Sequence, residues 1–206
     1  MTDNPPAQAG EGRLTYSYRP SLLGAPWEFV LTGETLDFRA GRKAGRVSFR
    51  KIRRMRLSFR PIAMQSQRFL AEIWAEGAPK LEICSSSWKS MVEQERFDRA
   101  YATFVGELHR RVAQEGRTVR FEQGSSPLLY WPGLAIFVVV SLALAALVVH
   151  GLQAQTMAGA GIVAAFLLIF LWQAGNYFRR NRPGFYRPDA LPVALMPGTS
   201  PYSRAS

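Results

Sequence analysis

The chain of 206 residues is poor in the side chains that most often make catalytic and metal sites. It has one cysteine, Cys84, and two histidines, His109 and His150. A single cysteine excludes an internal disulfide framework. Neither histidine has a Cys, Asp or Glu at the spacing of a zinc site, and no histidine near Cys84 in the sequence could act as its base. We therefore expect no catalytic residue, no metal and no cofactor, with Cys84 as a small strand residue.

Charge is missing from one long part of the chain. Residues 127–178 contain no Asp, Glu, Lys or Arg, and a short polar turn at 151–156 divides them into two apolar stretches, 128–150 and 157–178. A helix of twenty-odd residues is roughly 30 Å long, the thickness of a hydrocarbon core. The pattern predicts a transmembrane helical hairpin, with His150 at the end of the first span.

The predicted hairpin has the features of an anchor. Neither span contains the ionisable groups that usually mark ion or proton pathways. Gly161 and Ala165 form a small-xxx-small step, which we expect to pack within the hairpin, with an oligomer contact as the alternative. Four aromatic residues lie near the span ends as predicted membrane-interface anchors: Tyr130, Trp131, Trp172 and Tyr177.

Basic residues flank both ends of the hairpin, within a net charge of +11. By the positive-inside rule, both flanks and both termini are expected on the cytoplasmic side. The flanking arginines are Arg110, Arg111, Arg117 and Arg120 before the first span, and Arg179, Arg180 and Arg182 after the second.

The residues before the hairpin have the patterns of strands followed by a helix. After a polar leader, 1–12, expected to be disordered, apolar residues alternate in about seven short segments up to residue 85. The alternation slips at Ile52, which suggests a bulge or bend. The period then changes to that of an amphipathic helix, with Ser90 and Glu93 as a capping box and Gly116 as its end. The apolar stripe is Phe97, Tyr101, Phe104, Leu108 and Val112, with His109 expected at the surface.

Seven short strands need a strongly bent sheet or an open barrel to bury their apolar faces, with the helix closing one end. We therefore expect the α+β class, with a domain over 13–116 and a connector over 117–127. A set of loose motifs runs through these strands: Tyr18-Arg19-Pro20-Ser21, Leu36 with Phe38, Gly41-Arg42, Val47-Ser48-Phe49, Ile52 and Met55-Arg56-Leu57. In these motifs the sequence resembles bacterial pleckstrin-homology-like (PH-like) membrane proteins, although many of these have their membrane helices first. The resemblance implies a PH-like barrel and no uniform ligand.

Residues 39–60 contain ten basic residues and no acidic one. If the apolar residues of these strands point inward, their arginines point outward. Three interpretations are open: a solvated strand pair, a face for anionic lipid headgroups, or a docking face for an acidic protein. Nucleic acid is disfavoured because no exposed aromatics or base-reading motif accompany the charge. The candidate residues are Arg42, Lys43, Arg46, Arg50, Arg54, Arg56 and Arg60.

The proline-rich tail, 179–206, is either disordered or an extended segment lying on the chain's own domain. The expected function is that of a non-enzymatic scaffold or adaptor, which presents a basic PH-like domain at the cytoplasmic face of a bacterial inner membrane. The alternative is an accessory subunit of a transport or envelope-assembly complex. Oligomerisation is left open by the sequence.

Overall fold

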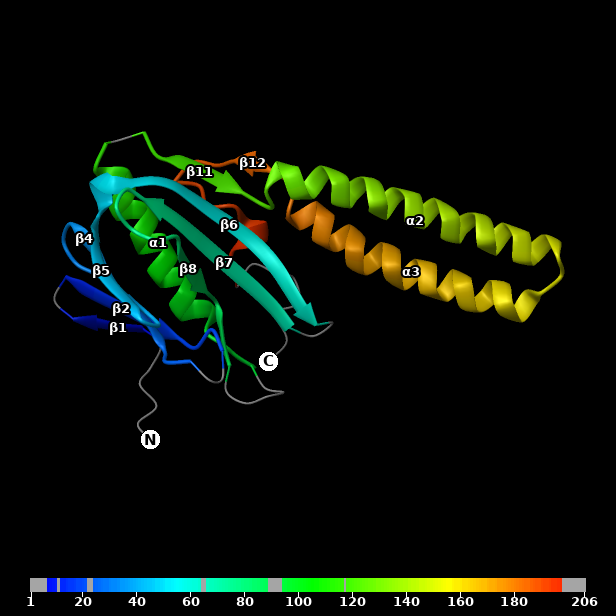
Figure 1. Cartoon of the computed structure of the whole chain (residues 1–206), viewed down its shortest axis with the longest axis horizontal. Helices are drawn as coiled ribbons and strands as arrows, with labels where there is room; N and C mark the ends of the chain where they lie inside the picture. Colours follow the sequence, from blue (N-terminus) through cyan, green and yellow to red (C-terminus); the bar gives the residue numbers. More distant parts are fainter. Residues whose placement is uncertain are drawn as a thin grey trace. The chain divides into compact units, whose positions relative to one another are not determined.

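A computed structural model of the chain describes residues 7–10, 12–21, 24–63, 66–88, 94–116 and 118–197. Within these residues the chain is mixed α+β, with several sheets and three α-helices (Figure 1). It divides into two compact units. We call Met1–Gln123 with Gly184–Ser206 the domain, and Gly124–Pro183 the hairpin. The hairpin is therefore inserted into the domain, which continues after it.

The first sheet is an antiparallel meander of five strands. Its first strand lies inside the segment expected to be a disordered leader, and that expectation is wrong for residues 7–10, which pair with residues 13–16. Gly12, at φ +71°, supplies the left-handed conformation in the connecting turn. Residues 1–6 and 11 lie outside the described residues. The strands are β1 (Ala7–Gly10), β2 (Arg13–Tyr18), β3 (Trp27–Leu31), β4 (Thr35–Ala40) and β5 (Lys43–Ser48).

The second sheet follows a short 3-10 turn, η1 (Phe49–Lys51). The slip predicted at Ile52 is confirmed, because this turn and a register shift just after Ile52 redirect the chain. The seven predicted strand segments correspond to β2–β8, and five further strands were not predicted. The remaining strands up to α1 are β6 (Ile52–Ala63), β7 (Ser66–Ala75), β8 (Leu81–Cys84), β9 (Ser86–Trp88) and β10 (Gln94–Arg96).

Helix α1 (Asp98–Gln114) presents the predicted apolar stripe to the core. The helix begins later than expected because residues 94–96 pair with β9 instead. The proposed capping residues Ser90 and Glu93 lie outside the described residues. Gly116 ends the helical region at φ +66°, as predicted. One continuous core joins α1 to both large sheets. Its fully buried members include Tyr16, Phe29, Leu31, Leu36, Met55, Leu57, Ile73, Leu81, Tyr101, Phe104 and Leu108.

The chain on either side of the hairpin adds two strands to the second sheet. β11 (Arg120–Gln123) runs parallel to β6, and β12 (Gly184–Phe185) pairs antiparallel with β11. The sheet order is therefore β12-β11-β6-β7-β8. The entry and exit segments of the hairpin are thus hydrogen-bonded to each other inside the domain.

The tail after β12 belongs to the domain, in agreement with the docked alternative rather than the disordered one. The 3-10 turn η2 (Val193–Leu195) lies near β6, and Leu195 is only 2% exposed. Leu191 and Met196 pack against the same core. Residues 198–206 lie outside the described residues.

The expected exposure of His109 is wrong, because its side chain is completely buried. Its ring contacts those of Phe121 in β11 and Tyr186 in the tail, at centroid distances of 5.6 and 5.8 Å. Nδ1 lies 2.6 Å from the Val105 carbonyl oxygen and therefore donates to it, so Nε2 accepts from the Tyr186 hydroxyl at 2.7 Å. The periodicity of α1 could not reveal that later segments return to cover this edge.

The hairpin consists of α2 (Pro127–Gln153) and α3 (Met157–Arg180), which are long and apolar enough to cross a membrane, with mean hydropathies of 2.7 and 2.0. The predicted packing role of Gly161 and Ala165 is wrong, because both are exposed within the hairpin. The close contact between helices is instead at Gly151, where an added Cβ would lie 3.1 Å from the Ala160 methyl group. Helical phase, rather than the spacing alone, decides which small residues face the partner helix.

Burial of His109 predicts a loss of domain stability in mild acid. Desolvation lowers the pKa of His109 from 6.5 to about 4. The folded state therefore favours the neutral ring, and stability should fall between pH 6.5 and 4, by at most about 1.4 kcal/mol per pH unit. The pKa of Glu107, lowered to about 2 chiefly by hydrogen bonds from Arg110, affects a lower pH range.

This pH dependence can be measured from the denaturation midpoint of the domain in the full chain. His109→Gln should flatten it, while the matched change His150→Gln, at an exposed position of α2, should leave it unchanged. An unaltered slope in His109→Gln would contradict the assignment.

Candidate anion-binding surface

The strands that carry the basic residues have the predicted orientation. Val47, Phe49, Met55, Leu57 and Phe59 are each no more than 3% exposed, and the arginines between them face away from the core. The arginines of β5, η1 and β6 are correspondingly exposed or half-buried.

Most of this positive charge is neutralised within the domain. Six of the ten basic residues at 39–60 have a carboxylate partner, and five of those six were candidate site residues. Exposed pairs of this kind contribute little to stability, but each reduces the net field that an external anion would meet. The pairs are Arg46–Asp37 (2.7 Å), Arg50–Glu115 (2.8 Å), Arg53–Glu76 (2.6 Å), Arg54–Glu122 (3.9 Å), Arg56–Glu122 (2.6 Å) and Arg60–Glu72 (3.8 Å).

The pair of Arg56 with Glu122 joins β6 to β11. Both Nε and Nη2 of Arg56 donate to the same carboxylate oxygen, at 3.1 and 2.6 Å, and both side chains are largely shielded from solvent. The neighbouring Arg54 guanidinium lies 3.7 Å from the centre of the Trp74 ring, in a cation–π contact. These arginines therefore link the central strand β6 to its neighbours β11 and β7.

Of the four basic residues at 39–60 without a carboxylate partner among the described residues, three lie at one turn, and the fourth, Lys51, lies in η1. Among the described residues, Arg39, Arg42 and Lys43 have no carboxylate within ion-pairing distance, and all three are exposed. Gly41, at φ +64°, permits the tight turn between β4 and β5 at which they lie, with Arg39 and Lys43 on opposite faces of the strand pair. We call these three residues the β4–β5 cationic turn. Arg39 was not among the candidates, because the sequence could not show which arginines had partners.

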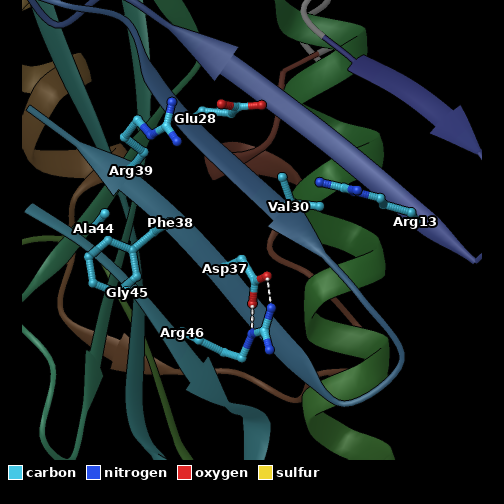
Figure 2. A pocket seen from close by; sticks show the side chains of 9 residues that line it. All are labelled: Arg13, Glu28, Val30, Asp37, Phe38, Arg39, Ala44, Gly45 and Arg46. Atoms are coloured by element: carbon cyan, nitrogen blue, oxygen red, sulfur yellow. Dashed lines mark hydrogen bonds and ion pairs between the residues drawn. The ribbon is translucent and has the colours of Figure 1, made fainter.

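An open pocket of about 420 Å³ lies beside this turn, on the first sheet (Figure 2). Arg13, Arg39 and Arg46 line it together with Glu28 and Asp37, so charges of both signs alternate around it. Arg46 makes two hydrogen bonds to Asp37, at 2.7 and 2.8 Å, and they hold the pKa of Asp37 below its ordinary value. Asp37 thus remains an anion that compensates Arg46, and the excess positive charge lies at the turn.

The predicted interface aromatics divide into two kinds within the hairpin. Trp131 and Trp172 are 62% and 67% exposed, as an anchor in a bilayer interface requires. Tyr130 is buried and donates to the Phe178 carbonyl at 3.3 Å, and the Tyr177 hydroxyl lies 3.1 Å from that of Ser125. The two tyrosines therefore also hold the ends of α2 and α3 together.

No cluster of three or more potential metal ligands occurs in the described part of the chain. Cys84 is buried, receives a hydrogen bond from Arg68, and lies 3.7 Å from the Ser86 hydroxyl. Comparison of the chain with protein-family models, with curated proteins and with solved structures finds no match.

The division between structural and uncompensated arginines predicts different effects on stability. Arg56→Gln should lower the free energy of unfolding by about 1–3 kcal/mol, because it leaves the shielded Glu122 carboxylate with a weaker partner. Arg42→Gln should change it by less than about 0.5 kcal/mol. Denaturant midpoints of the two variants provide the measurement, and equal effects would contradict the division.

Proposed function

We propose that the chain is a non-enzymatic adaptor of a bacterial inner membrane, anchored by α2 and α3. In this proposal a PH-like domain presents the β4–β5 cationic turn to anionic lipid headgroups on the cytoplasmic side. The observation that supports it most directly is the pairing of β11 with β12, between which the two apolar helices are inserted.

The order of elements supports the PH-like assignment. Strands β2–β5 form one antiparallel meander and β6–β8 form another, and α1 follows them along the chain. All three contribute to one core. Seven strands followed by one helix are what the sequence resemblance implies, and β1 and β9–β12 are additions to them.

The connections to the hairpin support the anchoring role. Only residues 124–126 separate β11 from α2, and only residues 181–183 separate α3 from β12. A connector of three residues spans at most about 11 Å, which would keep the domain close to a bilayer crossed by the hairpin. Because β11 and β12 pair directly, both flanks belong on one side, and their arginines favour the cytoplasmic side.

The cationic turn suits contact with an anionic surface rather than binding of one small ligand. Its three cations are exposed on a tight turn, and each basic residue near a negatively charged leaflet contributes about 1 kcal/mol of attraction. Tethering makes such weak attraction sufficient to orient the domain, since the turn remains near the membrane without it.

A label on the turn tests the proposal in the full chain. Ala44→Cys, carrying bimane, would be reconstituted in vesicles of phosphatidylcholine alone or mixed with phosphatidylglycerol. We expect the anionic vesicles to protect the label from aqueous acrylamide at low salt, and added salt to reverse the protection. Arg42→Gln with Lys43→Gln should remove most of the effect.

Arg50→Gln with Arg53→Gln is the matched control, because it removes the same charge from residues that already have carboxylate partners. Protection should persist in this control. Protection that is independent of phosphatidylglycerol, or lost equally in both double variants, would contradict contact of the turn with anionic lipid.

A further inference from the structure

In the described part of the domain, the large apolar side chains that are mostly exposed fall in one segment. Among the described residues of the domain, only Phe185 and Val193 are large, apolar and more than half exposed, at 77% and 63%. Both follow the hairpin, in β12 and in η2. Single exposed apolar residues are ordinary on protein surfaces. A phenylalanine this exposed, a few residues after an apolar hairpin in the sequence, suits contact with the apolar part of a membrane.

The chain segment around Phe185 is basic, while its cross-strand neighbour in β11 is Glu122, which pairs with Arg56. Arg182 and Arg187 are exposed on either side of it, and neither has a carboxylate partner among the described residues. The only acidic residue after the hairpin is Asp189. An exposed aromatic ring between uncompensated arginines is the composition of segments that lie in the interface of an anionic bilayer.

The backbone holds Phe185 in place for such a contact. Phe185 is opposite Glu122 in the β11–β12 pair, and the next residue, Tyr186, is fixed in the core by its hydrogen bond to His109. The side chains of successive strand residues point to opposite faces. The half-buried Tyr186 follows β12 in extended pairing with Phe121 and turns toward His109, so Phe185 turns outward and its exposure follows from this pairing.

We propose that the segment from Arg182 to Val193 docks into the headgroup interface of the bilayer that the hairpin crosses, with Phe185 as its apolar contact and Arg182 and Arg187 as its headgroup contacts. This inference rests on the proposed function only in requiring that α2 and α3 span the membrane. Phe185 lies five residues beyond the end of α3, within reach of the surface at which that helix emerges.

Lipid-borne quenchers test the docking in the full chain. Phe185→Cys would carry the fluorophore NBD, in vesicles of phosphatidylcholine with nitroxide-labelled lipid. Cys84 is buried, so the chain without an added cysteine serves as the labelling control. Quenching of the label at 185 should be several times stronger than at the matched exposed site Glu34→Cys, in the turn between β3 and β4. A label at Val193→Cys should also be quenched.

Quenching at 185 no stronger than at 34 would overturn the docking, as would self-quenching between labelled copies without quenching by lipid. Retention of the chain in the vesicles after alkaline extraction tests the spanning hairpin separately. Quenching at 185 without any response of the label at Ala44 to phosphatidylglycerol would support this inference and contradict the proposed lipid contact of the β4–β5 cationic turn.

Discussion

Hydrogen bonding between β11 and β12 is the constraint on which the rest of this structure depends. It fixes the two ends of the hairpin to each other and to β6, and it places the chain after the hairpin in the same domain as the chain before it. Without it, Tyr186 would not reach His109, and Leu195 would not reach the core. The hairpin is thus an insertion whose two ends are fastened within one sheet.

The carboxylate partners of the basic residues at 39–60 leave a smaller positive surface than the sequence suggests. Ten basic residues at 39–60 suggest a broad anion-binding face, but six of them pair with carboxylates, and three of these six pair with Glu115 or Glu122. Glu115 and Glu122 lie more than sixty residues from the arginines they neutralise. What remains is a small cationic turn, and in the proposed adaptor its effect depends on tethering rather than on high intrinsic affinity.

Local patterns predicted the elements that depend on local spacing. Alternation located β2–β8, the helical stripe of Tyr101 and Leu108 located the buried face of α1, and the uncharged stretch located the hairpin. Such local patterns do not predict contacts between segments that are far apart in the sequence. The burial of His109, the two strands beside the hairpin and the exposure of Gly161 each depend on which distant segment packs nearby or on helical phase. The surface site was only partly predictable for the same reason.

The most direct test of the account is the distance between the two flanks of the hairpin in a membrane. Nitroxides at Arg120→Cys and Arg187→Cys, both exposed, would report it by electron paramagnetic resonance, with each single label as control. Neighbouring strands lie about 5 Å apart, so the account predicts strong dipolar coupling in reconstituted vesicles. Spectra that equal the sum of the two single-label spectra would contradict the pairing of β11 with β12.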